Sequence, residues 1–118
     1  MQTLGDRIRT ARVAAGLGLR ELARRLEKAP SYLSDIENDR RVPSEEVLHA
    51  LSRELGLDFD ELMALAGRVG EQAERYLRRS PAAAMLFRRI LESRLKEAEL
   101  RGLIDQVDQM RPRKAPKR

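Results

Sequence analysis

Hydrophobic positions recur at helical spacing from the beginning of the chain. Leu4, Ile8, Ala11 and Ala15 follow one another at intervals of three or four residues, which places them on one face of a helix. Gly16 comes next, at the point where many helices end in a left-handed residue. The pattern therefore predicts a helix from Leu4 to Ala15.

Two further helices follow, joined by a short turn. Apolar residues at positions 19, 22, 23 and 26 predict a helix over residues 19–26. The next helix is predicted over residues 30–38 and begins with Pro30, which the first turn of a helix tolerates. Leu33 and Ile36 lie on its predicted core side. Two short helices at this spacing are typical of a helix-turn-helix unit.

The chain continues with two more helices that carry start and stop signals. Ser44 is placed to cap a fourth helix, and Gly56 to end it. Asp58 and Glu61 have the spacing of a capping box at the start of a fifth helix. Five amphipathic helices that close at Gly67 predict a compact all-helical domain.

The remainder of the chain predicts three more helices with a different character. A helix over residues 71–79 has a thin apolar stripe. Ser80 and Pro81 form a strong start signal for a helix over residues 81–94, and another is predicted over residues 97–110. These last two helices carry an apolar stripe made of Leu86, Phe87, Ile90, Leu91, Leu95, Leu100, Leu103, Ile104 and Val107.

The net charge of +5 is unevenly distributed along the chain. Residues 1–66 carry ten Lys and Arg against twelve Asp and Glu, whereas residues 67–118 carry fourteen against seven. Five of those cations lie in residues 111–118, a stretch with two prolines that we predict to be a disordered basic tail. The overall charge is therefore weak evidence for a nucleic-acid partner, and the argument depends on where the cations lie.

Composition limits the chemistry that the chain can perform. It has no cysteine, and its single histidine, His49, is predicted on the solvated side of a helix, so we expect no metal site. No carboxylate cluster is arranged with a base or nucleophile, so we expect neither an enzyme nor a cofactor. No long apolar run and no signal-peptide core are present, which leads us to expect a soluble cytoplasmic protein that does not enter membranes.

The helix predicted over residues 30–38 has a polar side suited to reading DNA bases. Opposite its core direction lie Ser31, Asp35 and Asn38, with Ser34 and Tyr32 on the two flanks. Their hydrogen-bonding groups can reach base edges in the major groove of double-stranded DNA. Asp35 is unusual, because phosphates repel a carboxylate. Either Asp35 accepts a hydrogen bond from the amino group of a cytosine, or its charge lies over the groove and weakens binding to DNA sequences other than the operator.

Cations near this helix are predicted to contact DNA phosphates. Arg40 and Arg41 lie in the loop that follows it, and Arg20 lies near the start of the preceding helix. Contacts of this kind supply affinity and orient the protein without reading sequence.

A set of residues over about half the chain follows the pattern of a known family. The matching features are Ile8-Arg9 with Arg12, Gly16-Leu17, Glu21-Leu22-Ala23, Leu26, the run from Ser31 to Asn38, Pro43-Ser44, and Leu55-Gly56. With these features the chain resembles the lambda-repressor/Cro-type helix-turn-helix family, also called the XRE family. The resemblance implies an all-α fold, in which a five-helix lambda-repressor-like DNA-binding domain precedes a short helical C-terminal dimerisation region.

The resemblance also implies one ion pair and points to three departures. In that family the residues at the positions of Arg12 and Glu37 pair, which ties the first helix to the third. Leu19 occupies a position often held by a glutamine that contacts phosphate, so that contact is in doubt. Glu27 and Asp39 stand where glycine is common, which predicts less usual turn geometry.

These observations predict a sequence-specific DNA-binding transcriptional regulator of bacterial or phage-like origin. We expect a homodimeric repressor on a palindromic operator, with residues 1–67 binding DNA and residues 68–110 forming the dimer. The apolar stripe of the last two helices could instead fold back and cover the first domain. We favour dimerisation, because a second copy related by a two-fold axis doubles the number of base pairs contacted. The alternative is an antitoxin or a stress or mobile-element repressor, whose C-terminal region binds or is inactivated by a partner protein such as a toxin or protease.

Overall fold

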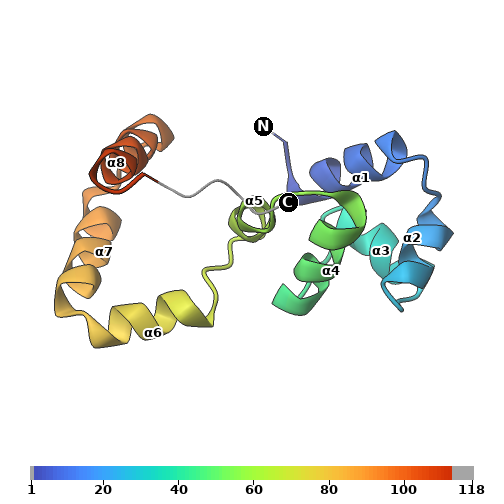
Figure 1. Ribbon diagram of the computed structural model, residues 1–118, viewed down its shortest axis with the longest axis horizontal. Helices are drawn as coiled ribbons and strands as arrows, with labels where there is room; N and C mark the ends of the chain where they lie inside the picture. Colours follow the sequence, from blue (N-terminus) through green and yellow to red (C-terminus); the bar gives the residue numbers. More distant parts are fainter. Residues whose placement is uncertain (1, 113–118) are drawn as a thin grey trace. The chain divides into compact units, whose positions relative to one another are not determined.

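The computed structural model describes residues 2–112 and contains eight α-helices and no strand in that range (Figure 1). The predicted all-α class is therefore confirmed, and each predicted helix is present with ends within about a residue of those expected. The helices are α1 (Leu4–Ala14), α2 (Leu19–Arg25), α3 (Pro30–Glu37), α4 (Glu45–Leu55), α5 (Phe59–Leu65), α6 (Glu71–Arg79), α7 (Pro81–Ser93) and α8 (Glu97–Met110).

The chain divides into two compact units whose boundary falls within α6. Unit 1 ends at Glu74 and unit 2 begins at Arg75. The prediction placed the boundary after Gly67. Arg68, just beyond that point, still contacts unit 1, since its Nε donates a hydrogen bond to the carbonyl oxygen of Pro43 at 2.8 Å. The predicted tail residues 113–118 lie outside the described part of the chain.

The hydrophobic core of the described chain lies in unit 1. Its members come from α1 to α5 and from Leu26, which directly follows α2, whereas Ala15, predicted on the apolar face of the first helix, is exposed. They are Leu4, Ile8, Leu22, Ala23, Leu26, Leu33, Ile36, Val47, Leu48, Leu51, Leu62 and Met63. Leu33 and Ile36 have no exposed surface, so one side of α3 is held rigidly against the domain while its other side stays free.

Helix α1 approaches the end of α3 more closely than a side chain at position 5 would allow. A Cβ atom built on Gly5 would lie 2.8 Å from both the carbonyl carbon of Glu37 and the carbonyl oxygen of Ile36. Both are backbone atoms and cannot rotate away. Glycine is therefore required here for the contact between α1 and α3.

We expect Gly5→Ala to destabilise the protein by about 2 kcal/mol, because the methyl group forces α1 away from α3. Gly102→Ala is the matched control, since it places the same methyl group in α8 with no atom within 4 Å. A helix interior favours alanine over glycine by up to about 1 kcal/mol, so the control should be neutral or stabilising. Thermal unfolding followed by circular dichroism measures both. Equal unfolding midpoints would contradict the close approach.

The turns around α3 contain two residues in left-handed backbone conformation. Glu27, between α2 and α3, has φ 57°, and Asp39, after α3, has φ 58°. The unusual turn geometry predicted at these positions is therefore present. At Asp39 the side chain offsets the strain, because its carboxylate accepts hydrogen bonds from the Thr3 hydroxyl at 2.7 Å and the Gly5 amide at 3.0 Å.

Helix α5 begins with half of the predicted capping box. The Asp58 carboxylate accepts hydrogen bonds from the amides of Asp60 and Glu61. The Glu61 carboxylate instead pairs with Arg7 Nε of α1 at 2.7 Å, so the reciprocal half is replaced by a contact between helices. His49 is exposed as predicted, but its ring also stacks on Phe59, with 3.6 Å between ring centroids.

Unit 2 has no buried residue in α7 or α8. Ile90, Leu95, Leu100 and Leu103 are half-buried. The large hydrophobic side chains that stay exposed in this unit are Tyr76, Met85, Leu86, Phe87, Leu91, Ile104, Val107 and Met110. None of the helices within residues 2–112 is long and apolar enough to cross a membrane.

Candidate nucleic-acid interface

A buried carboxylate connects α3 to the first helix. The side chain of Glu37, at the end of α3, is only 3% exposed. Arg12 Nε lies 2.7 Å from its Oε2 atom, and a second guanidinium nitrogen lies 3.0 Å from Oε1. This is the ion pair that the resemblance implied. The hydrogen bonds from Arg12 to the Glu37 carboxylate raise the pKa of Arg12 above its ordinary value, so the guanidinium stays charged.

A second arginine, Arg9, which was named from the sequence only as part of the family pattern and given no role, completes this connection. Arg9 Nη2 donates to the Glu37 carbonyl oxygen at 3.2 Å and to Asn38 Oδ1 at 3.1 Å. Its Nε lies 3.4 Å from the Glu37 carboxylate. Arg9 lies one helical turn before Arg12, and that spacing was the available signal. The C-terminal end of α3 is thus positioned by two side chains of α1.

The predicted base-reading residues differ in how free their side chains are. Ser31 is exposed, while Ser34 and Asp35 are half-buried on the same side of α3. Asn38 is exposed, but its amide nitrogen donates to the Ser34 carbonyl oxygen at 2.8 Å, and its oxygen accepts from Arg9. Asn38 therefore ends α3 and must exchange these hydrogen bonds before it can contact a base.

The carboxylate of Asp35 has a cationic partner. Arg40 Nε, from the loop after α3, lies 3.1 Å from Asp35 Oδ1. The pair offsets the negative charge on the exposed side of α3, which removes much of the expected repulsion from phosphates. It also means that Arg40 is already engaged.

Three other cations have no carboxylate partner among the described ion pairs: Lys28 and Arg41, on either side of α3 in the sequence, and Arg20, at the start of α2. Lys28 was not singled out in the sequence, although it lies two residues before the start of α3. Lys28 and Arg41 both lie against the ring of Tyr32. The exposed surface around α3 therefore combines hydroxyl groups with available positive charge.

Two other arginines of α2 are occupied. Arg24 and Arg25 both pair with Glu21, and Arg25 also reaches Glu54 at 3.5 Å. The hydrogen bond from Arg24, followed by that from Arg25, lowers the pKa of Glu21 to about 2. Internal pairing thus distinguishes these two arginines from Arg20 on the same helix.

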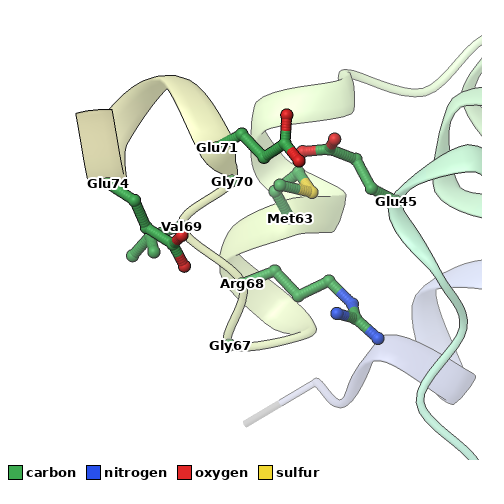
Figure 2. A pocket seen from close by; sticks show the side chains of 8 residues that line it. All are labelled: Glu45, Met63, Gly67, Arg68, Val69, Gly70, Glu71 and Glu74. Atoms are coloured by element: carbon green, nitrogen blue, oxygen red, sulfur yellow. The ribbon is translucent and has the colours of Figure 1, made fainter. Parts of the chain in front are cut away.

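A separate hollow of about 330 Å³ lies in unit 1 beside the start of α6. Figure 2 shows the carboxylates of Glu45 and Glu71 above Met63, with the Arg68 side chain directed away from them. Glu74 adds a third acidic lining residue. This surface does not suit a phosphate backbone. Within residues 2–112, no three His, Asp or Glu side chains are grouped to hold a metal ion.

The sequence that forms unit 1 matches a known family. The model of the helix-turn-helix domain matches residues 5–68. Transcriptional regulator ClgR of Mycobacterium tuberculosis is 36% identical over 81 residues, which cover 69% of this chain and 72% of that protein, in strains CDC 1551 and H37Rv alike. The chain belongs to the XRE-type helix-turn-helix family and is a DNA-binding transcriptional regulator.

Solved structures of similar chains include two regulators. The crystal structure of the clp gene regulator ClgR from Corynebacterium glutamicum is 24% identical with a TM-score of 0.48, and the match covers 93% of this chain and 92% of that chain. The SinR protein/SinI protein complex contains a chain that is 26% identical with a TM-score of 0.49, covering 94% and 100% respectively.

Proposed function

We propose that this regulator is a homodimeric repressor that binds a palindromic operator through α3. The observation that carries the proposal is the contrast between the two units. Unit 1 has a complete core and a polar, cation-bordered side of α3. Unit 2 leaves large apolar side chains exposed on α7 and α8. Large apolar side chains exposed together on neighbouring helices are typical of interaction surfaces, and a second copy is the occupant that we propose for them.

Within each half-site we propose that Ser31, Ser34 and Asp35 contact base edges. The hydroxyl groups can donate or accept, and Asp35 can accept from a cytosine amino group while Arg40 balances its charge. We assign Asn38 to holding the end of α3, with base contact only after its hydrogen bonds exchange. Arg20 contributes a phosphate contact beside the groove.

A dimer of this kind represses by occupying promoter DNA. Two copies of α3 related by a two-fold axis contact half-sites about one helical turn apart, so the bound protein covers DNA that RNA polymerase must reach. The DNA in question lies in the cytoplasm, which is therefore the proposed location. A protein partner on unit 2 is the competing proposal, and the oligomeric state of the purified chain separates the two.

Selection of bound fragments from a random DNA pool tests the site and its symmetry together. We expect the enriched fragments to share a two-fold symmetric sequence, and a promoter carrying that sequence to be less active when the protein is present. An asymmetric enriched site would contradict the dimeric arrangement. Failure to enrich any sequence would contradict base reading by α3.

Ser31→Ala is expected to weaken binding to the selected site about fivefold and to relax the preference at one base pair in each half-site, because one hydrogen bond is lost. Thr10→Ala is the control, since Thr10 is an exposed hydroxyl on α1. Competition binding with single-base variants of the site measures both effects. An equal loss on all DNA sequences would argue against a base contact by Ser31.

A further inference from the structure

We propose that Tyr32 is a positioning residue that holds Lys28 and Arg41 together as a clamp for one stretch of DNA phosphate backbone. The proposal rests on the proposed contact of α3 with the groove and deepens it. It also changes the role expected for Tyr32, from contact with a base to control of two neighbouring cations.

The geometry places both cations on one aromatic ring. Lys28 Nζ lies 5.3 Å from the centroid of the Tyr32 ring, and Arg41 Cζ lies 4.9 Å from it. Both distances are within the range of cation–π attraction. The ring itself is half-buried and packs against the core, so it provides a fixed surface. Lys28 precedes α3 and Arg41 follows it, and the ring is what brings them together.

The charges of this cluster point to an anionic ligand. Neither Lys28 nor Arg41 has a carboxylate partner among the ion pairs of residues 2–112, whereas Arg24, Arg25 and Arg40 each have at least one. Two positive charges held beside the same ring repel each other. Phosphates of one stretch of DNA backbone that contact the two cations offset this repulsion.

The chemistry of a guanidinium held over an aromatic ring suits a phosphate contact. Arginine can lie against an aromatic face while its in-plane N–H groups remain free to donate to phosphate oxygens. Because the ring restricts both side chains before DNA arrives, less conformational freedom is lost on binding. Tyr32 is on a flank of α3, so the cations lie beside the groove-facing side and not on it.

The test compares Tyr32→Leu with Tyr32→Phe in the full chain. Leucine keeps an apolar side chain against the core but has no aromatic face, whereas phenylalanine keeps the face and loses only the hydroxyl group. The probe is a fluorescent random-sequence duplex of about 20 base pairs, titrated between about 50 and 200 mM NaCl, because the slope of log K against log salt counts phosphate contacts. Arg24→Gln is the control for a change of net charge, since Arg24 is paired with Glu21.

Tyr32→Leu is expected to weaken binding about tenfold at low salt and to reduce the slope by about one, which corresponds to one lost phosphate contact. Tyr32→Phe and Arg24→Gln should keep the wild-type slope. An unchanged slope in Tyr32→Leu would overturn the proposal, and so would an equal reduction in Tyr32→Phe, which would assign the contact to the hydroxyl group. If the wild-type protein shows no salt-dependent binding to the duplex, the result contradicts the proposed contact of α3 with the DNA groove, on which the clamp depends.

The unfolding midpoints of the two Tyr32 variants show whether each is folded. Should Tyr32→Leu unfold, Lys28→Gln and Arg41→Gln supply the test, because each removes one exposed cation and keeps the ring. Each is expected to reduce the slope by about one, whereas Arg24→Gln removes the same charge without that effect. Slopes equal to the wild-type value in both variants would overturn the clamp.

Discussion

Arg12→Ala is expected to destabilise unit 1 by about 3 kcal/mol, because it leaves the carboxylate of Glu37 buried with an incomplete set of partners. Glu37 is 3% exposed and Arg12 14%, so water cannot readily replace the lost guanidinium. Arg9 remains within 3.4 Å of the carboxylate and offsets part of the loss. For a domain of this size the expected fall in unfolding midpoint is about 15 °C.

Two further variants show whether the buried charge causes this loss. The double exchange Arg12→Met with Glu37→Leu removes both charges and should recover most of the stability, since well-packed apolar residues often replace a buried ion pair without loss. Arg24→Ala breaks an exposed pair and should leave the midpoint nearly unchanged. Thermal and urea unfolding measure all three. A double variant as unstable as Arg12→Ala would show that packing, and not the uncompensated carboxylate, sets the cost.

The second large effect is expected on assembly. Ile104→Glu should raise the dissociation constant of the proposed dimer at least about 100-fold, because burying an unpaired carboxylate in an apolar interface costs about 3 kcal/mol or more. Ile104 is 56% exposed in the single chain, so the substitution leaves the fold of unit 1 undisturbed. Binding to the selected operator should weaken in parallel, since a monomer contacts one half-site.

Sedimentation velocity over a range of protein concentrations measures the oligomeric state. Gln106→Glu is the matched control, because it adds the same charge to an exposed position of α8 two residues away. The control should sediment as the wild type does. A wild-type chain that is monomeric at every concentration would contradict the dimer and favour a different protein as the partner of unit 2. Equal dimerisation of Ile104→Glu would show that α8 is not at the interface.

Much of the helical organisation was predictable from the sequence, because its signals are local. Thr3, Ser44 and Ser80 each accept a backbone hydrogen bond at the start of their helices, and Gly16 and Gly56 take the left-handed backbone at helix ends. Such signals depend on residues within one turn of one another. The capping box predicted for α5 is only half formed, because the Glu61 side chain pairs with Arg7 of α1, which lies 54 positions away in the sequence.

The sequence by itself determined the helices, the apolar side of α3 and the family, since periodicity and motif spacing are properties of neighbouring residues. Only the tertiary structure decided which polar groups around α3 are free. Arg40 is engaged by Asp35, Asn38 by Arg9, and the ring of Tyr32 brings Lys28 to Arg41. Pairing of this kind depends on distances between side chains that the fold brings together, and a helical wheel for a single element contains none of those distances.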